Sequence, residues 1–416
     1  MSRSDLAHMN GSGRRTLGLV LSGGGARGAY EAGVLHYIRT MLPPKIRYRP
    51  FDVHCGSSVG AINTCFLAAT SHDMRRQASD VRLLWEALRS DNIYRRDTGA
   101  FFNFLARTGR GVMTSIFSRK RGHFHGFLDT EPFLHFVERI LPWEMISKNI
   151  AEGIIRAVSI VATNVFTGRT ELFIEKHDGV EYTGEYIHHL TPIQPLHAKA
   201  SAAIPLVFPT VQINGIAYTD GGLRLNTPMS PAIQLGADSL LVIGVHHRAK
   251  HGEKIPFHGQ KGHDPALGQV MGRVMNSIFL DRLQYDIEQL ERINRVIDWA
   301  EEIYGNDFLL DLNRMLHRKN IRGDIANRGL KRLRVIRIRP SEDIGELFSH
   351  CFRRHREEKL SNFEKFLVRF LDIDPTAGVD FLSYISFLPE YTRKLLDLGF
   401  EDARTQHAEL KEFFEG

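Results

Sequence analysis

The strongest constraint on the fold is a pair of strand–turn–helix units at the start of the chain. In the first unit, the apolar run TLGLVL precedes the glycine-rich segment SGGGARG, and AYEAGVLHYIRTML then carries apolar residues at helical spacing. In the second unit, FDVHC predicts a strand, GSSVG a tight turn, and AINTCFLAAT a helix that is buried on most faces. Two such units in close succession favour an α/β fold with a mostly parallel central sheet and helices on both faces.

The remaining strands are expected in later segments with apolar or alternating patterns. These segments are IIRAVSIVAT, TELFIE, VQINGIAYTD, SLLVIGV and LRVIRIRP. We therefore expect four regions along the chain. They are a disordered N-terminal tail (1–15), a catalytic core (16–250) with a cap at about 89–127, a helical insertion with a returning strand (251–340), and a C-terminal helical appendage (341–416).

Composition excludes several classes of protein. The chain has 416 residues, 43% hydrophobic and 25% charged, which is typical of globular proteins. The three cysteines, Cys55, Cys65 and Cys351, form no CxxC pair and no even-numbered set. They indicate neither a zinc site nor a disulfide framework, and they favour a reducing compartment.

Membrane contact is expected to be peripheral. No stretch approaches the roughly 20 consecutive apolar residues that a membrane-spanning helix needs. The first apolar run, TLGLVL, is cut short by SGGGARG before it reaches the length of a signal sequence. We expect a cytoplasmic protein, and its formal charge of +6 suits anionic surfaces such as lipid headgroups.

GSSVG matches the GxSxG pattern of a nucleophile elbow and stands between an expected strand and an expected helix. At such an elbow a strained turn exposes the serine hydroxyl, and glycines two residues to either side allow close packing. Gly56 and Gly60 have that spacing around Ser58, and Ser57 does not. The alternative interpretation is a Gly/Ser helix N-terminus without catalysis.

The segment before the first helix is rich in glycine, and its residues are Gly23, Gly24, Gly25, Ala26, Arg27 and Gly28. Amides exposed at a helix N-terminus bind either a phosphate or the oxyanion of a tetrahedral intermediate. The string also satisfies GxGxxG, but a dinucleotide site needs an acidic residue at the end of the second strand. Asp52 starts that strand and Cys55 ends it. With an elbow downstream, the oxyanion loop is the better interpretation.

A nucleophilic serine needs a base, because a free hydroxyl is a poor nucleophile at neutral pH. One source is a histidine, as in a Ser-His-Asp triad, with four candidates: His197, His246, His247 and His263. The other is Asp220, which ends a strand-like segment and is followed by Gly221 and Gly222. No histidine has a context that singles it out, so Asp220 is the better candidate.

The order GGGARG, GSSVG, DGG makes the sequence resemble the patatin-like phospholipase family, of the bacterial type. ASAAIPLVFP before Asp220, GGLRLNTP after it and PSEDIGEL later in the chain also fit the resemblance, which spans roughly Leu17 to Val245. It implies that Ser58 is the nucleophile, that Asp220 is the base, and that the backbone of residues 23–28 forms the oxyanion hole. It implies no catalytic histidine, no metal and no cofactor.

The resemblance also implies the reaction, which is lipid acyl hydrolysis through a Ser/Asp dyad and an acyl-enzyme. Phospholipids, lysophospholipids and neutral glycerides all remain open as substrates. The alternatives are a Ser-His-Asp carboxylesterase or thioesterase, and a catalytically silent lipid-binding protein with the same fold. The implied partner is a membrane phospholipid or another acyl lipid.

The expected cap mixes basic side chains with phenylalanines. The residues singled out are Arg119, Lys120, Arg121, Phe101, Phe102 and Phe104. Such a segment can lie in a membrane interface with its rings down and its cations toward anionic headgroups. Alternatively, the phenylalanines pack inward beneath solvated arginines. A second basic run, 318–339, matches no nucleic-acid-binding motif, and we expect no nucleic-acid partner.

Overall fold

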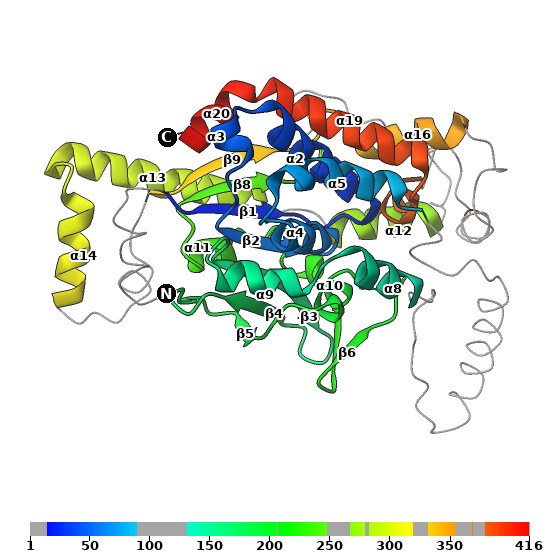
Figure 1. Ribbon diagram of the computed structural model, residues 1–416, viewed down its shortest axis with the longest axis horizontal. Helices are drawn as coiled ribbons and strands as arrows, with labels where there is room; N and C mark the ends of the chain where they lie inside the picture. The colour runs from blue at the N-terminus through cyan, green and yellow to red at the C-terminus, as the bar shows by residue number, and fades with distance from the viewer. Residues whose placement is uncertain are drawn as a thin grey trace, which may run out of the picture.

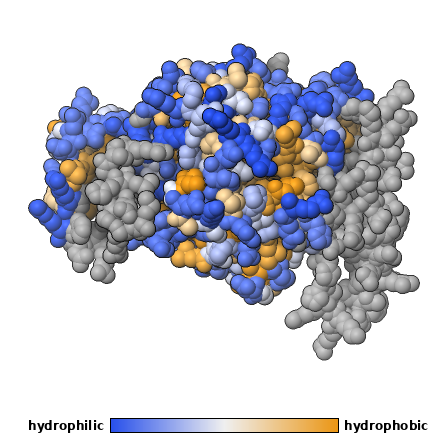
Figure 2. Space-filling view, in the orientation of Figure 1, coloured by the Kyte–Doolittle hydropathy of each residue, from blue (hydrophilic) through white to orange (hydrophobic). Residues whose placement is uncertain are grey.

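The computed structural model describes residues 15–89, 131–205, 207–247, 267–278, 283–318, 332–354, 368 and 379–415. Predictions for the N-terminal tail up to residue 14, for the cap residues named above and for His263 fall outside this part of the chain. None of the described helices combines the length and the apolar character that crossing a bilayer requires. Figure 2 shows a mainly hydrophilic face that is interrupted by small apolar patches.

The described strands form one mostly parallel sheet, as expected from the sequence. Their bounds are β1 Leu17–Leu21, β2 Val53–Ser57, β3 Ala157–Asn164, β4 Thr170–Lys176, β5 Ile187–Leu190, β6 Val211–Ile213, β7 Ile216–Asp220, β8 Ser239–Ile243 and β9 Arg334–Ile338. The order is β5-β4-β3-β2-β1-β8-β9, and β7 pairs with both β3 and β6. The run from β9 to β3 is parallel throughout, and β3 pairs antiparallel with β4 and β7.

Every strand expected from the sequence is present. LRVIRIRP returns as β9 beside β8, with Ser239 opposite Arg334, although the helical insertion separates them in the chain. The sequence did not predict β5, a short strand paired with β4 at the sheet edge. Its residues IHHL are mostly exposed, so they lack the apolar alternation by which a strand is recognised.

Helices cover both faces of the sheet (Figure 1). Their bounds are η1 Gly25–Gly28, α2 Ala29–Met41, α3 Pro44–Arg47, α4 Val59–Ala69, α5 Met74–Ala87, α8 Glu131–Ile140, α9 Glu144–Ala151, α10 Pro195–Ser201, η2 Gly221–Leu223, α11 Met229–Gln234, α12 Leu267–Ile278, α13 Leu283–Tyr304, α14 Phe308–Arg318, α16 Ile344–Arg354, α18 Val379–Ile385, α19 Pro389–Thr405 and α20 His407–Glu415. The residues of β1 alternate between two cores. Leu19 and Leu21 pack with α2, α4 and α5, whereas Val20 packs with α11 and α13.

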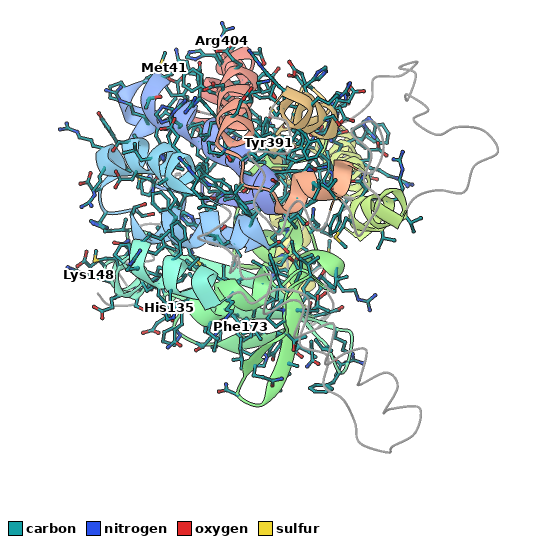
Figure 3. All side chains as sticks on the ribbon, turned by 90° about the vertical axis from the view of Figure 1, so that its right-hand side faces the viewer. Met41, His135, Lys148, Phe173, Tyr391 and Arg404 are labelled. Carbon is teal, nitrogen blue, oxygen red and sulfur yellow. The ribbon has the colours of Figure 1, made fainter. Side chains whose placement is uncertain are left out.

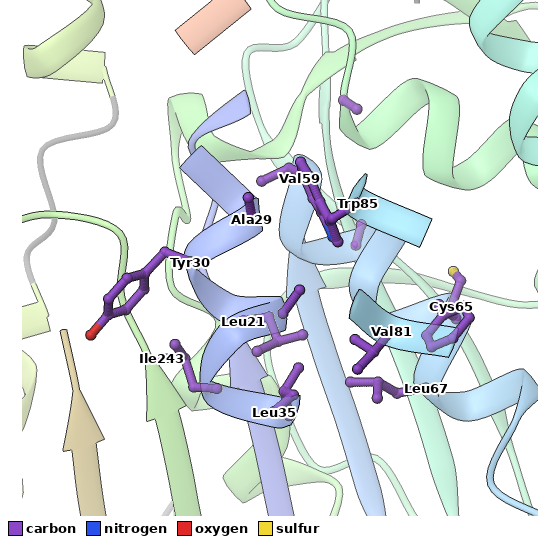
Figure 4. Packing of buried hydrophobic residues seen from close by; sticks show 14 of the residues in the cluster. Leu21, Ala29, Tyr30, Leu35, Val59, Cys65, Leu67, Val81, Trp85 and Ile243 are labelled. Carbon is purple, nitrogen blue, oxygen red and sulfur yellow. The ribbon is translucent and has the colours of Figure 1, made fainter. Parts of the chain in front are cut away.

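The larger core lies between the sheet and helices α2, α4 and α5. Figure 4 shows Leu21 of β1 facing Leu35 of α2, with Leu67 and Trp85 nearby on α4 and α5. All four side chains are at most 2% exposed. Burial of such apolar surface, at roughly 25 cal/mol per Å², stabilises the packing of α2 and α4 on the sheet.

The C-terminal helices, which the sequence predicted, pack into this core. α19 packs directly on α2, because glycines remove the side chains at the contact. A Cβ on Gly33 would lie 2.1 Å from the Leu396 oxygen, and one on Gly399 would lie 2.1 Å from the Tyr30 oxygen. Figure 3 places Tyr391 of α19 within this helical layer. The sequence predicted the helices, but not the glycine contact that brings them together.

Candidate active site

The elbow holds Ser58 between the end of β2 and the start of α4. Its φ of 53° and ψ of −127° lie in a region that residues with a side chain rarely adopt, so the turn stores strain. Glycine is required on both sides. A Cβ on Gly56 would lie 2.4 Å from the Gly60 oxygen, and one on Gly60 would lie 2.4 Å from the Leu21 oxygen. The close crossing of β1, β2 and α4 therefore forces the serine into its position.

Asp220 ends β7 and lies against the serine. The Ser58 hydroxyl donates to Asp220 Oδ2 at 2.6 Å, and the Gly222 amide donates to Asp220 Oδ1 at 2.7 Å. Both oxygens of the carboxyl are therefore hydrogen-bonded, and its orientation is set. β7 reaches this place because it pairs antiparallel with β3, with Asp220 opposite Ala162.

Burial makes Asp220 an unusually basic carboxylate. It raises the pKa of the Asp220 carboxyl from the ordinary 3.8 to about 7, while the hydrogen bonds from Ser58 and Gly222 act in the opposite direction. A carboxylate with a pKa near 7 accepts a proton from a hydroxyl more readily than an exposed one does, and about half of it is ionised at neutral pH.

No histidine of the described chain touches this pair. The sequence offers four histidines as alternative candidates for the base: His197, His246, His247 and His263. His197 is buried, its ring is stacked 4.5 Å from that of Phe173, and burial lowers its pKa to about 4. His247 Nδ1 lies 3.0 Å from the Pro340 oxygen. Within the described residues, the arrangement is a serine–carboxylate pair.

The glycine-rich segment passes directly beside the nucleophile, since a Cβ on Gly23 would lie 2.8 Å from the Ser58 Cβ. Two of its amides are used within the protein. The Gly23 amide donates to the Asn226 oxygen and the Arg27 amide to the Gly24 oxygen, both at 3.2 Å. The amides of Gly24 and Gly25 have no acceptor among the described residues. Within residues 23–28, the Gly24 and Gly25 amides are therefore the better candidates to donate to an oxyanion than those of Gly23 and Arg27.

The chain after Asp220 ties this segment down. Asn226 accepts from the Gly23 amide, its own side-chain amide donates to the Gly23 oxygen at 3.4 Å, and Thr227 shares a 2.7 Å hydrogen bond with Ser22. Sequence reasoning did not single out Asn226 or Thr227, although both lie in the segment GGLRLNTP. The same short segment thus positions the carboxylate and the glycine loop.

A buried carboxyl lies behind the glycine turn. Asn63 Nδ2 donates to Glu31 Oε2 at 2.8 Å and to the Gly28 oxygen at 3.2 Å, and Trp85 Nε1 donates to Asn63 Oδ1 at 2.9 Å. Burial raises the pKa of Glu31 well above its ordinary value. This network links the turn to α4 and α5, and the sequence pattern contains no sign of it.

An apolar pocket opens above Ser58. Its volume is about 600 Å³ including the open mouth, and its lining is almost entirely aliphatic or aromatic. The lining residues are Gly25, Ser58, Val59, Ile62, Leu84, Trp85, Leu88, Phe136, Val137, Ile140, Ala202, Ile204, Phe208, Tyr384 and Phe387. An apolar pocket that ends at a serine hydroxyl fits a hydrocarbon chain attached to an ester.

Metal-binding side chains do not gather in the described part of the chain. No group of three or more His, Cys, Asp or Glu side chains lies together there.

Comparison with known proteins supplies the family. The family described as Patatin-like phospholipase matches residues 19–233, about half of the chain. The chain therefore belongs to the patatin-like phospholipase family.

Two curated relatives are each similar to about half of the chain. The cGAMP-activated phospholipase of Pseudomonas aeruginosa (strain BWHPSA011 / Pa011) is 28% identical over 215 residues, 50% of this chain and 53% of that protein. The probable lipid hydrolase 463L of Invertebrate iridescent virus 6 is 26% identical over 218 residues, 52% of this chain and 63% of that protein. The matched part of the chain thus spans less than two thirds of either relative.

One solved structure is similar at a lower identity. The crystal structure of VipD from Legionella pneumophila aligns with 92% of this chain and 67% of that chain, at 15% identity and a TM-score of 0.31. A likeness at this level supports no argument about function.

Proposed function

We propose that the chain hydrolyses fatty-acyl esters of lipids, with Ser58 as nucleophile and Asp220 as base. The observation that carries this proposal is the 2.6 Å hydrogen bond from the Ser58 hydroxyl to a fully buried carboxylate at the base of an apolar pocket. The two curated relatives, named as a phospholipase and a probable lipid hydrolase, support the same substrate class.

The chemistry follows from the positions of these groups. Asp220 takes the proton of Ser58 as the Ser58 oxygen attacks the ester carbonyl, and the Gly24 and Gly25 amides stabilise the oxyanion. Collapse of the intermediate breaks the ester bond, and Asp220 gives the proton to the departing alcohol. A water molecule then loses a proton to Asp220 and attacks the acyl-enzyme. As the bond between the acyl group and the Ser58 oxygen breaks and the fatty acid leaves, Asp220 returns the proton to that oxygen and restores the serine.

The pocket favours a single acyl chain as the bound group. Leu84, Leu88, Phe136 and Ile140 offer apolar contact along its walls, and burial is worth about 0.8 kcal/mol per methylene. A phospholipase A or lysophospholipase activity fits this arrangement, because both reactions attack an ester that carries one long chain.

The lipid would be reached at a membrane surface. We propose a cytoplasmic protein that contacts membranes peripherally through the basic and phenylalanine-rich cap, including Arg119, Lys120 and Arg121. Reversing these three charges should weaken binding to anionic vesicles by a factor of roughly 10², since each basic residue contributes about 1 kcal/mol. Unchanged co-sedimentation of the triple glutamate variant, with intact turnover of a soluble ester, would show that the cap does not bind the membrane.

Fatty-acid release tests the activity. The parent chain is incubated with phosphatidylcholine and with lysophosphatidylcholine in mixed micelles, and free fatty acid is measured by mass spectrometry. We expect release by the parent and by Ser57→Ala, and none by Ser58→Ala. Turnover of a short-chain ester but of neither lipid would redirect the proposal to a carboxylesterase. Absence of any turnover would leave the lipid-binding alternative.

A further inference from the structure

The C-terminal part of the chain touches the glycine turn directly. α18 packs against η1, and a Cβ on Gly25 would lie 2.0 Å from the Tyr384 oxygen. Gly25 has a φ of 57°, so the turn there depends on glycine for its conformation as well as for this contact. The loop that faces Ser58 on one side is therefore bounded by α18 on the other.

The Arg27 side chain links the glycine turn to α18. Its side chain is 4% exposed, and its Nε and Nη2 both donate to Ser383 Oγ, at 3.1 and 2.6 Å. The guanidinium carbon lies 3.8 Å from the centroid of the Tyr384 ring, within the range of a cation–π interaction. A buried guanidinium is costly without partners, so these contacts favour one relative position of turn and helix.

Contacts with α12 and α19, and with a ring that lines the pocket, fix the position of α18. The Tyr384 hydroxyl donates to Asn276 Oδ1 of α12 at 2.6 Å. The Tyr391 hydroxyl of α19 donates to the backbone carbonyl oxygen of Ser383 at 3.3 Å. Phe387 stacks on Trp85 at 6.4 Å between centroids, and both rings line the pocket together with Tyr384. Movement of α18 would therefore change both the glycine turn and the pocket wall.

We propose that Arg27, Ser383 and Tyr384 form a clasp that sets the position of the oxyanion donors. Arg27 is a positioning residue, since it acts through the turn that carries the Gly24 and Gly25 amides. Two members of the clasp come from a segment far beyond residues 19–233, over which the family matches. The C-terminal region of this chain thus completes the active site. The inference rests on the proposed acyl hydrolysis.

The test is a comparison of kcat and KM for a soluble short-chain ester. Ser383→Ala removes a hydroxyl that accepts two hydrogen bonds from Arg27, and Ser383→Thr restores a hydroxyl. Ser71→Ala is the matched control, because Ser71 is also buried and donates to the Leu67 oxygen at 2.7 Å, at the far end of α4. Fluorophosphonate labelling of Ser58 is measured in each variant to count competent sites.

We expect Ser383→Ala to lower kcat by about ten- to a hundredfold with KM changed by less than about threefold, as for a loss of alignment in the transition state. Ser383→Thr should recover most of kcat, and Ser71→Ala should keep it. If Ser383→Ala does not fold, Arg27→Lys, which retains the charge without the two-pronged donation, is judged by the same criterion.

An active parent whose kcat is unchanged in Ser383→Ala would overturn the clasp and leave the proposed function intact. Equal losses of activity in Ser383→Ala and Ser71→Ala would also overturn the clasp, since the effect would then come from the loss of a buried hydroxyl in general. A parent chain that neither turns over esters nor labels at Ser58 would overturn both the clasp and the proposed function.

Discussion

Replacing Asp220 by asparagine should stabilise the protein at alkaline pH while it removes activity. The folded state holds Asp220 at a pKa of about 7, against 3.8 for the ordinary carboxyl. A group whose pKa is raised by folding adds stability below its unfolded pKa, and that stability is lost as the pH rises through the folded pKa. The two pKa values differ by about three, which corresponds to about 4 kcal/mol of unfolding free energy. This stability is lost between about pH 4 and pH 8.

Urea unfolding of the parent and of Asp220→Asn over this pH range measures the effect. Asparagine does not titrate, so the stability difference between the two proteins isolates Asp220 from the other ionisable groups. We expect this difference to shift in favour of Asp220→Asn as the pH rises, by up to about 4 kcal/mol, and to level off above about pH 8. A difference that does not depend on pH would refute a raised pKa, and with it the argument that burial makes Asp220 a competent base.

Three further outcomes follow from the site. Ser58→Ala should abolish ester turnover. Ser57→Ala should keep a measurable part of it, because the buried Ser57 hydroxyl has no hydrogen-bond partner among the described residues. Equal losses in the two variants would contradict the role of Ser58 as nucleophile. Single alanine substitutions of His197 and His247 should leave the rate within about tenfold of the parent, far from the roughly 10⁴-fold loss for a triad member; a histidine variant as inactive as Asp220→Asn would indicate a triad. Turnover should persist in excess EDTA, since the proposed electrophile is the glycine-turn backbone, and loss that calcium restores would point to a metal-dependent reaction.

The fold could be predicted where it depends on local pattern. The two strand–turn–helix units specified β1, β2 and the helices after them, because apolar periodicity and glycine position are local signals. LRVIRIRP was predicted as a returning strand, and it pairs with β8. The short edge strand β5 was missed, since its exposed residues IHHL carry no apolar alternation.

The candidate pair also depends on local signals in the sequence. Ser58 and Asp220 lie in short motifs, and the structure brings them within hydrogen-bond distance. Ser383 and Tyr384 could not be found in this way, because more than 350 residues separate them from Arg27 and VDFLSYI resembles any buried helix. Contacts between residues far apart in the chain produce no local pattern from which they could be predicted.

We propose that Asp220 alone activates Ser58. The most direct measurement is the rate at which a fluorophosphonate labels Ser58, followed by mass spectrometry as a function of pH in the parent and in Asp220→Asn. Labelling of the parent should occur at Ser58, rise about tenfold per pH unit below about pH 7 and level off above it, as for one ionising base. Asp220→Asn should label slowly at every pH. Equal labelling rates in the two proteins would show that Asp220 does not activate Ser58, and labelling at a different serine would show that Ser58 is not the nucleophile.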